Sequence, residues 1–432
     1  MIKNLSLFFF ILFLFSCSLS DSGGFWSKEK TLKKENLKFK SLLKKEDKVL
    51  KEFNQNFKLT LDKSNFNKDK NYFINNNDGF TLFDGQLKKI RKYNFDKIKN
   101  FYNLEPNLIF FQNNIIFFDN KGSILSFDAN SKLNWKINNY SRAERKDGPL
   151  LILKSSNDKL IVADNFSNYY AININNGNIL WSKKIDAPFN SEIKIFNNKI
   201  FITDSSNTLN CFSLANGNLL WTHTTEKSFI NSKKKLSIIL NNQSVIFSNS
   251  LGEITSVNIN NGSLLWQRST ENSKIYEDIM TLKTSDLILK ENSIYFSNNK
   301  NKFYSIDAKT GTINWVQNIN SNLKPTSIDK LILTVSIDGH FFILDRISGN
   351  ILRITDLFNQ LNVKQKMIYP TGFILNYEKL FVSLSNGRII IAKIKTGKVI
   401  DIIKIDNEII SRPFVKNQNM YLIRDNSIIK LN

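Results

Sequence analysis

The 432-residue sequence contains few of the residues on which catalytic and metal sites most often depend. It has two histidines, His223 and His340, and two cysteines, Cys17 and Cys211. A structural zinc site needs about four such ligands at close spacing, so we expect none here. The sequence also lacks the G-x-S-x-G turn of serine hydrolases and the glycine-rich loop that holds phosphates. From these absences we expect that the protein has no catalytic residues and no metal site.

Long apolar runs are equally scarce. The one clear example, LSLFFFILFLF at residues 5–15, follows Lys3 and has the length of a signal-peptide core, well short of the roughly 20 residues that span a bilayer. It ends in LFSC at residues 14–17, which resembles the lipobox of bacterial lipoproteins. The resemblance implies a signal peptide at residues 1–16 and lipidation of Cys17. The alternative is an ordinary secretion signal with an incidental cysteine.

In that lipoprotein family, a residue other than aspartate after the cysteine favours the outer membrane. Ser18 therefore implies a lipid-anchored protein of the outer membrane that faces the periplasm. With Cys17 lipidated, Cys211 has no partner, which excludes a disulfide framework. Cys211 lies in the alternating run LNCFSL, where we expect a buried core residue.

The net charge of +22 arises from 60 Lys and Arg against 38 Asp and Glu. The lysines are spread over turns and solvent-facing positions, so we expect no nucleic-acid partner. Residues 17–75 are rich in lysine and predict a lipidated tether followed by a basic, solvated or partly helical linker. A segment that binds the membrane surface is the alternative for this stretch.

From residue 76 onward, runs of β-formers alternate with Asn, Asp, Gly and Ser, and one turn recurs. The segment NINNGNILW (173–181) returns as SLANGNLLW (213–221) and NINNGSLLW (258–266). A glycine stands four residues before a tryptophan at Gly177/Trp181, Gly217/Trp221, Gly262/Trp266 and Gly311/Trp315, and Trp135 follows Ser131 in the same frame. ISGNILR and KTGKVID keep the glycine but replace the tryptophan by Arg353 and Asp401, and FDGQLKK, with Gly85 and Lys89, is a candidate further copy.

The frame recurs every 38 to 49 residues, which is typical of β-propellers with one blade per repeat. We predict an all-β propeller at residues 76–432, with eight blades of four antiparallel strands. The last repeat has three strands, so an N-terminal strand from LKKIRKYNF (87–95) is expected to complete it and close the ring. The glycines allow tight turns, and the tryptophans are expected to pack at the seams between blades.

This repeat resembles the tryptophan-docking repeats of pyrroloquinoline quinone (PQQ)-type propellers over about residues 85–432. The superfamily includes PQQ-dependent dehydrogenases and BamB, a lipoprotein subunit of the machinery that assembles outer-membrane β-barrels. The dehydrogenases stack a vicinal cysteine pair on the quinone and bind Ca²⁺ near a catalytic aspartate, and the sequence here has neither feature. A lipobox followed by one eight-bladed propeller is similar to BamB. The resemblance implies a monomeric, non-enzymatic scaffold without a cofactor.

In the BamB family, loops between blades bind the periplasmic POTRA domains of the barrel-inserting subunit, which is BamA-like. The corresponding loops here are residues 225–237 and 270–286, which carry apolar residues among polar neighbours. The resemblance implies partner binding by Phe229, Ile230, Lys233, Ile275, Tyr276 and Met280. An acidic pair that the family uses falls near Lys283 and Ser285, which is a departure. Unfolded outer-membrane proteins are the other implied partner, and an enzymatic or ligand-binding envelope propeller and a propeller that binds cell wall or periplasmic proteins are the alternatives.

The lipid anchor gives a direct test. Cells grown with labelled palmitate should incorporate the label into the wild-type protein, and a Cys17→Ala variant should carry none, because the cysteine thiol is the acceptor. A Cys211→Ala variant is the matched control and should be labelled like the wild type. Equal labelling of Cys17→Ala and wild type would show an ordinary secretion signal instead.

Overall fold

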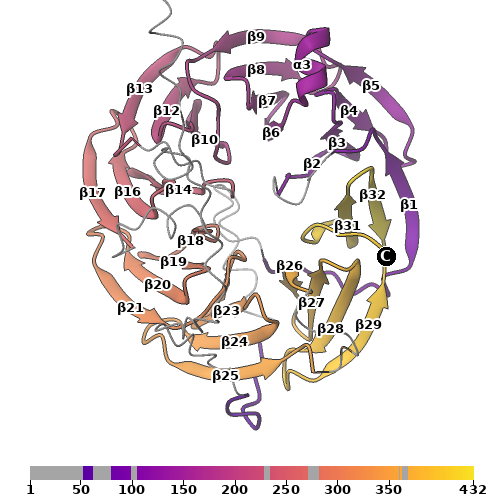
Figure 1. The fold of residues 1–432 in the computed structure, drawn as a ribbon, viewed down its shortest axis with the longest axis vertical. Coiled ribbons are helices and arrows are strands. Elements are labelled where there is room, and N and C mark those ends of the chain that lie inside the picture. Colours follow the sequence, from indigo (N-terminus) through magenta and orange to yellow (C-terminus); the bar gives the residue numbers. More distant parts are fainter. Residues whose placement is uncertain are drawn as a thin grey trace, which may run out of the picture. The chain divides into compact units, whose positions relative to one another are not determined.

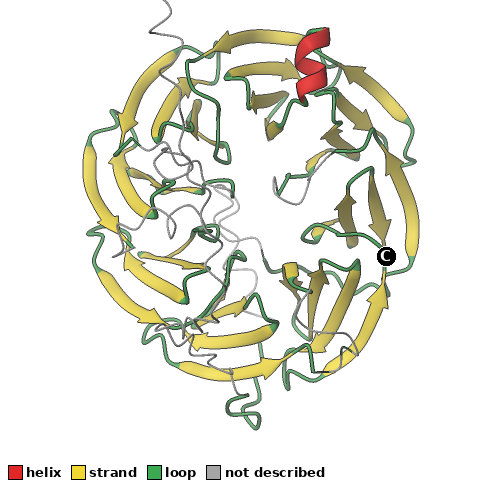
Figure 2. Ribbon diagram, viewed as in Figure 1, coloured by secondary structure: helices red, strands yellow, loops and turns green. Residues whose placement is uncertain are grey.

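The computed structural model describes residues 52–61, 79–98, 105–227, 234–270, 282–359, 361 and 368–432. Contacts divide the chain into Met1–Leu50 and Lys51–Asn432, and the second unit contains all of these residues. It is a ring of eight four-stranded antiparallel sheets around a common centre (Figure 1), with one short helix among the described residues (Figure 2). The predicted eight-bladed all-β propeller is confirmed.

Seven blades follow the chain from the centre outward. Blade 1 consists of β2 (Ile109–Phe111), β3 (Asn114–Phe118), β4 (Ile124–Phe127) and β5 (Leu133–Ile137). Blade 2 consists of β6 (Leu151–Ser156), β7 (Lys159–Asp164), β8 (Asn168–Asn173) and β9 (Ile179–Lys184). Blade 3 consists of β10 (Lys194–Phe196), β11 (Lys199–Thr203), β12 (Thr208–Ser213) and β13 (Leu219–Thr224). Blade 4 consists of β14 (Ile238–Leu240), β15 (Ser244–Ser248), β16 (Glu253–Asn258) and β17 (Leu264–Ser269).

The remaining blades have the same order of strands. Blade 5 consists of β18 (Ile288–Lys290), β19 (Ser293–Asn298), β20 (Lys302–Asp307) and β21 (Ile313–Gln317). Blade 6 consists of β22 (Thr326–Ile328), β23 (Leu331–Val335), β24 (His340–Asp345) and β25 (Ile351–Asp356). Blade 7 consists of β26 (Pro370–Leu375), β27 (Lys379–Leu384), β28 (Arg388–Lys393) and β29 (Val399–Lys404). Blade 8 consists of β30 (Phe414–Lys416), β31 (Asn419–Arg424), β32 (Ser427–Leu431) and, from the other end of the chain, β1 (Lys89–Asn94).

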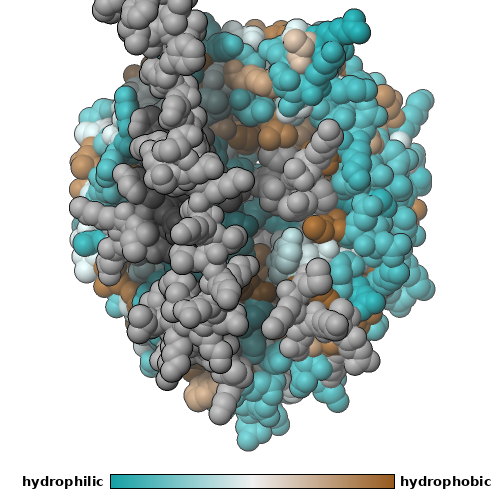
Figure 3. All heavy atoms as spheres, viewed as in Figure 1, coloured by the Kyte–Doolittle hydropathy of each residue, from teal (hydrophilic) through white to brown (hydrophobic). Residues whose placement is uncertain are grey.

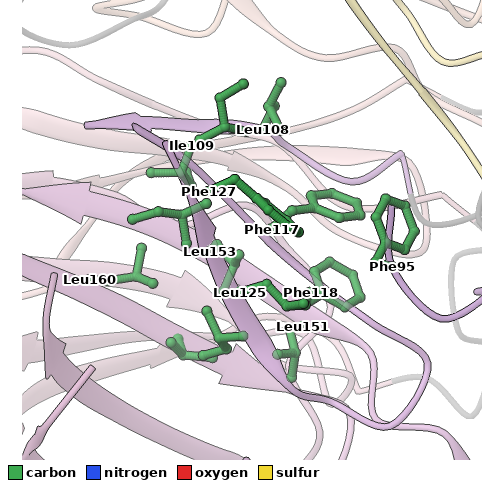
Figure 4. Close-up of a cluster of buried hydrophobic side chains, with 14 of the residues drawn as sticks. Phe95, Leu108, Ile109, Phe117, Phe118, Leu125, Phe127, Leu151, Leu153 and Leu160 are labelled. Carbon is green, nitrogen blue, oxygen red and sulfur yellow. The ribbon is translucent and has the colours of Figure 1, made fainter. Parts of the chain in front are cut away.

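The second and third strands of each blade are near-continuous apolar runs because both of their faces are covered by neighbouring blades. Their side chains form clusters that join one blade to the next. The cluster around Phe117, Phe118 and Leu125 also includes side chains of blades 2 and 8 (Figure 4). The fourth strands are mostly exposed; on β9, for example, five of the six residues are exposed. The apolar core therefore lies between the sheets, and the outer rim faces solvent.

Blade 8 closes the ring with strands from both ends of the chain. β1 pairs antiparallel with β32, and Lys92 stands opposite Ile429. Reciprocal backbone hydrogen bonds between Lys88 and Asn432, at 2.9 and 3.0 Å, extend this pairing beyond the strands. Tyr93 on β1 is buried and meets Phe127 of blade 1, with ring centroids 5.8 Å apart. The predicted closure by residues 87–95 is confirmed, and it leaves no unpaired edge on β32.

A β-bulge recurs near the start of every fourth strand. The pairing with the third strand skips one residue at Ile90, Asn134, Leu180, Leu220, Leu265, Asn314, Leu352 and Ile400. A bulge bends a strand and increases its twist, which suits the outermost strand of a blade. Because all eight bulges share one place, they define equivalent positions on different blades.

Two segments before β1 also pack on the propeller. Residues 52–61 lie along β25 (the indigo segment at the bottom of Figure 1), where Phe53 forms an antiparallel bridge with Ile354. Residues 79–88 contact blade 7, where Phe83 is fully buried against Phe381 at a ring-centroid distance of 5.3 Å. The first segment belongs to the stretch predicted as a linker, whose boundary at residue 75 stays a prediction.

The one described helix, α3 (Arg142–Asp147), links blades 1 and 2 and contains no buried residue. Its first turn is closed by a capping box, because the Ser141 hydroxyl accepts from the Glu144 amide while the Glu144 carboxylate accepts from the Ser141 amide. Gly148 ends it in the left-handed conformation. No described helix has the length and apolar character needed to cross a membrane.

Ring closure predicts different outcomes for two truncations. A chain that begins at Lys51 keeps β1 and should unfold cooperatively near the wild-type temperature. A chain that begins at Glu105 lacks β1, exposes the edge of β32 and uncovers Phe127, so it should associate and melt at least 10 °C lower, as several kcal/mol of lost burial implies. Size-exclusion chromatography and thermal circular dichroism measure both effects. Equal melting of the two chains would contradict the role given to β1.

Candidate functional site

The residues predicted to bind a partner lie outside the described part of the chain. These are Phe229, Ile230, Lys233, Ile275, Tyr276 and Met280, and Cys17 is outside it as well. Of the two positions where the sequence departs from the family, Lys283 and Ser285 are described, and Ser285 is buried beside the inner strand of blade 5. Its hydroxyl accepts a hydrogen bond from the Ser297 amide at 2.9 Å, so this position serves the blade itself.

The predicted docking residues meet at the seams between blades. Each glycine stands beside the tryptophan of the preceding blade: Gly177 beside Trp135, Gly217 beside Trp181, Gly262 beside Trp221, Gly311 beside Trp266, and Gly349 beside Trp315. A Cβ placed on Gly262 would lie 2.5 Å from Cε3 of Trp221, and the φ of this glycine is +73°. Glycine is thus required both by the turn and by the close approach of the indole. In each of these five pairs, the glycine and the tryptophan belong to neighbouring blades and lie in contact.

Several indoles also donate a hydrogen bond across the seam. The Nε1 atoms of Trp181, Trp266 and Trp315 donate to the carbonyl oxygens of Leu214, Ala308 and Arg346 at 3.4, 3.0 and 3.2 Å. Each acceptor stands three residues before the glycine that its tryptophan contacts. The face of the indole supplies apolar contact, and its N–H donates a hydrogen bond that fixes the orientation of the ring. Tryptophan thus buries its apolar surface and keeps its one polar group hydrogen-bonded.

Arg353 takes the place of the tryptophan between blades 6 and 7. Its side chain is fully buried, and its guanidinium donates to the carbonyl oxygens of Ile394 at 2.6 Å and Lys395 at 2.8 Å, and to that of Phe57 at 3.1 Å. Ile394 stands three residues before Gly397, so the acceptor position is the same as in the tryptophan seams. Burial lowers the pKa of Arg353 to about 10. Residues 52–61 therefore complete a seam that lacks an indole.

The candidate repeat at Gly85 and Lys89 was wrong in its register. Gly85 does not have a positive φ, and the bulge at Ile90 places Arg91, rather than Lys89, opposite the third strand where the tryptophans stand. The Arg91 guanidinium donates across the seam to the Asn130 carbonyl oxygen at 3.4 Å. The glycine spacing fails here because β1 and β32 come from opposite ends of the chain and no turn joins them.

The two histidines serve the blades. Nδ1 of His223, two residues beyond Trp221, lies 3.0 Å from the carbonyl oxygen of Gly262 on the next blade. Arg268 occupies the same place after Trp266 and donates to the Gly311 carbonyl oxygen at 2.9 Å. His340 begins β24, and its Nδ1 lies 3.3 Å from a carboxylate oxygen of Asp338 in the preceding turn. In the described residues no group of three or more His, Cys, Asp and Glu side chains could hold a metal ion.

A cluster of charged residues, which we call the central cluster, lies toward the centre of the ring, just before the innermost strands. Nζ of Lys234, which precedes blade 4, lies 3.6 Å from Asp286 of blade 5 and 3.5 Å from the Glu105 carboxylate that precedes blade 1. Nζ of Lys235 donates to the Glu105 carbonyl oxygen at 3.0 Å. Glu192 pairs with Lys194 at 3.2 Å. Because blades 1 and 4 stand far apart in the ring (Figure 1), these contacts join distant blades across its centre.

The charges of this central cluster depend on one another. Burial opposes ionisation of Asp286, but Lys234, Lys324 and Arg412 outweigh it and hold the pKa of this carboxyl well below its usual range. Burial likewise opposes ionisation of Glu192, and Lys194 is the main cause that its pKa is nevertheless lowered. Burial lowers the pKa of Lys235 in spite of the neighbouring carboxylates. The cluster is thus a set of ion pairs that needs its carboxylates charged.

The central cluster does not fit a quinone cofactor with its calcium ion. Calcium sites collect several oxygen ligands on one ion, whereas Glu105, Glu192 and Asp286 each face a lysine. Cys211, the one cysteine in the described part of the chain, is fully buried between blades, and burial raises the pKa of its thiol to about 12. It is an unreactive core residue, as predicted from its alternating run.

Some of these residues were not found from the sequence. The central cluster has a local signal, since Ser191-Glu192, Ser285-Asp286 and Ser411-Arg412 each place a charged residue after a serine just before a first strand. In each pair the serine hydroxyl accepts from an amide of the second strand, at 2.7 to 2.9 Å. The serine therefore holds the segment before the first strand against the second strand, and the charged residue that follows it belongs to the central cluster. Arg91 carries no comparable signal.

The tryptophan-docked seams and the eight-bladed ring define a propeller of the PQQ-like class. Within this class, the sequence pattern of the family described as outer membrane protein assembly factor BamB matches residues 120–355, more than half of the chain. The chain belongs to this family. No curated protein matches it by sequence.

Solved structures with the same fold have very different roles. BamB from Moraxella catarrhalis superposes with a TM-score of 0.64 at 15% identity, over 80% of this chain and 99% of that one. The computationally designed protein Ika8 gives 0.61 at 13% identity, over 81% and 99%. Quinohemoprotein alcohol dehydrogenase ADHIIG from Pseudomonas putida HK5 gives 0.61 at 11% identity, over 82% and 77%. These likenesses establish the fold.

Two glycines separate the steric role of docking from backbone strain. Gly262 and Gly148 have φ values of +73° and +77°, but the nearest atom to a Cβ on Gly148 would be 3.9 Å away. Gly148→Ala should cost about 1–2 kcal/mol for the left-handed conformation. Gly262→Ala should cost about 2–5 kcal/mol, because it also displaces Trp221. Urea unfolding measures both, and equal losses would show that the indole contact adds nothing.

The central cluster predicts a dependence of stability on acid. The folded-state pKa of Asp286 lies below its ordinary value of 3.8, so its stabilisation is present above that value and is lost as pH falls below it. Asp286→Asn should destabilise the protein at pH 7, because Lys234 loses a charged partner. The variant should also lose stability less steeply between pH 4 and 2, by up to about 1.4 kcal/mol per pH unit. Identical slopes in urea titrations would contradict this assignment.

Proposed function

We propose that this protein is a non-enzymatic, lipid-anchored scaffold of the outer-membrane β-barrel assembly machinery, and that it binds the periplasmic POTRA domains of the barrel-inserting subunit. The observation that carries the proposal is membership in the BamB family over residues 120–355. The lipobox at residues 14–17, from the sequence, is consistent with a protein held at the periplasmic face of the outer membrane.

The proposed mechanism is positional. A closed ring of packed blades is a rigid platform, and rigid platforms present binding loops without large ordering costs. We assign partner binding to Phe229, Ile230 and Lys233 on the loop before blade 4, and to Ile275, Tyr276 and Met280 on the loop before blade 5. In the sequence, both loops connect the fourth strand of one blade to the first strand of the next.

The alternative is a quinone-dependent enzyme, since such a dehydrogenase shares the fold. Two features of this chain favour a scaffold. The sequence has no vicinal cysteine pair, and the carboxylates of the central cluster are engaged by lysines. A quinone-dependent absorbance change after addition of PQQ and Ca²⁺ to the purified protein would support the alternative. A propeller that binds cell wall would instead be retained on purified peptidoglycan.

The partner can be tested by purification from membranes in mild detergent. The wild-type protein should recover the barrel-inserting subunit, and a Phe229→Asp/Tyr276→Asp variant should recover at least tenfold less, because a carboxylate in an apolar contact must be desolvated. Ile347→Asp is the control, since Ile347 is an exposed apolar residue, at 69%, in a turn of blade 6. Absence of the subunit from the wild-type preparation would overturn the proposed function.

A further inference from the structure

An open cavity of about 380 Å³ lies between blades 8 and 1, and we call it the seam cavity. It is lined by the turn between β2 and β3, by Ala129 in the turn after β4, and by parts of β30, β31 and β32. The central cluster stands at or before the beginning of first strands, so it lies at the other end of the blades. The volume is typical of small-ligand sites, which span about 300–1,000 Å³.

The seam cavity lies where the chain has no docking tryptophan. Arg91 takes that place on β1, and the residue opposite it on the third strand is Lys430. In the other seven blades, the residue opposite the docking position is small or aliphatic: Ser126, Ala171, Cys211, Ser256, Ser305, Ile343 and Ile391. Like charges directly opposite each other on two strands are destabilising. Blade 8 therefore has a pair of cations that the fold itself does not require.

Tyr421 brings a hydroxyl without a protein partner to the cavity. The residue is 6% exposed and lines the seam cavity. Tyr295 has the same register in blade 5, and its hydroxyl donates to the Arg346 carbonyl oxygen of the next blade at 3.3 Å. The corresponding carbonyl oxygen of blade 1, that of Ala129, accepts from the Tyr93 hydroxyl at 3.4 Å instead. Among the described residues, the Tyr421 hydroxyl thus has no partner, and a ligand in the cavity can bind it.

The lining of the cavity is basic. Lys416 and Lys430 are part of it, and no acidic residue is among the described residues that line it. Nζ of Lys430 lies 5.9 Å from the centroid of the Tyr421 ring. In the described part of the chain, neither lysine forms an ion pair, and Asp128 beside the cavity accepts from two amides of its own turn at 2.8 Å. An anion in the cavity would face both ammonium groups without competition from a carboxylate.

The outer strand beside the cavity adds to this positive charge. β1 carries Lys89, Arg91 and Lys92 and contains no acidic residue. In the space-filling view, the right-hand rim of the ring, where β1 lies, is mainly hydrophilic (Figure 3). Charges of one sign on neighbouring strands raise the local concentration of the opposite ion. The electrostatics of this seam therefore favours an anionic ligand over a neutral one.

Uncharged polar groups and aromatic rings indicate which kind of anion fits. Four carboxamide side chains without a hydrogen bond to another described side chain or backbone group line the seam cavity: Gln112, Asn113, Asn114 and Asn417. A carboxamide both donates and accepts, as a sugar hydroxyl does. Phe110 packs against Tyr421 with ring centroids 5.0 Å apart, which places apolar surface beside these polar groups. A bare inorganic anion would use the lysines alone, whereas an anionic sugar can also use the carboxamides and the apolar surface.

We propose that the seam cavity binds an anionic sugar, one that carries a carboxylate or a phosphate on a hydroxyl-bearing ring. Lys416 and Lys430 bind the anionic group, and the Tyr421 hydroxyl donates a hydrogen bond to the ligand. The carboxamides bind the ring hydroxyls. The inference goes beyond the proposed function and does not depend on it, because the cavity contains none of the residues assigned to the barrel-inserting subunit.

The ligand class is tested on the full-length protein, purified in a detergent without a sugar headgroup. Ligand-observed NMR titrations give the Kd for glucuronate, glucose 6-phosphate, glucose and inorganic phosphate. At least one of the two anionic sugars should bind tenfold more tightly than glucose and inorganic phosphate, and the two separate carboxylate from phosphate recognition. The methyl glycoside of the better sugar then distinguishes the end of a glycan, which binds in this form, from a free sugar held by its anomeric hydroxyl. Equal binding of inorganic phosphate, or no binding of either anionic sugar, would overturn the proposal.

The role of the hydroxyl is tested by Tyr421→Phe. Phenylalanine occupies this register in blades 3 and 7 as Phe201 and Phe381, so the variant should fold normally. It should bind the anionic sugar at least fivefold more weakly, because it loses one hydrogen bond to the ligand. Tyr295→Phe is the matched control, since its hydroxyl serves the blade, and it should bind within twofold of wild type.

The role of the charge is tested by Lys430→Met, which keeps an unbranched side chain. The variant should bind at least tenfold more weakly, and its melting temperature should not fall, because the repulsion from Arg91 is removed. Lys309→Met is the control, since Lys309 is exposed in a turn of blade 5, and it should bind like the wild type. Unchanged binding by both Tyr421→Phe and Lys430→Met, or equal weakening by their controls, would refute the assigned site.

Discussion

The whole ring depends on one contact, a flat or planar side chain of one blade laid on the turn of the next. Where the chain has tryptophan, the indole face covers a glycine and its N–H reaches a carbonyl oxygen three residues earlier. Where it has Arg353, a planar guanidinium reaches the same carbonyl position and needs an additional covering segment. Each blade contacts mainly its two neighbours, so a broken seam affects the rest of the molecule only through adjacent blades. Because β1 closes the ring, every blade keeps two neighbours, and the seams form and break cooperatively.

The docking contact divides the residues of the propeller into two groups: those that repeat in the blades and those that differ from blade to blade. Residues at the seams are set by their neighbours, so they carry little information about function. Residues that vary between blades are free of that restriction: the loops before blades 4 and 5, the charged residues of the central cluster, and the residues that line the seam cavity. The chain belongs to the BamB family and shares its fold with a quinohemoprotein alcohol dehydrogenase. The repeated seams define the fold, and the fold alone does not determine the function.

The sequence predicted what has a local signature. The period of the glycine and tryptophan turn predicted the number of blades, and the three strands after Pro413 predicted closure from the N-terminus. The register of that closing strand could not be predicted, because blade 8 has no turn to mark it, and Arg91 was missed for this reason. The central cluster joins Glu105 to Lys235, and only the ring brings such distant residues together. The covering of Arg353 by residues 52–61 depends on backbone carbonyls, which leave no trace in side-chain patterns.

The path of the chain before β1 has a mechanical consequence. Residues 52–61 cross the outer edge of blade 6, residues 79–88 follow on blade 7, and β1 then lies on blade 8. A pull transmitted from the residues before Glu52 would load the two hydrogen bonds between Phe53 and Ile354 first, and the strand that closes the ring last. Residues 52–61 would therefore leave the propeller before β1 does, and the pairing of β1 with β32 would still close the ring.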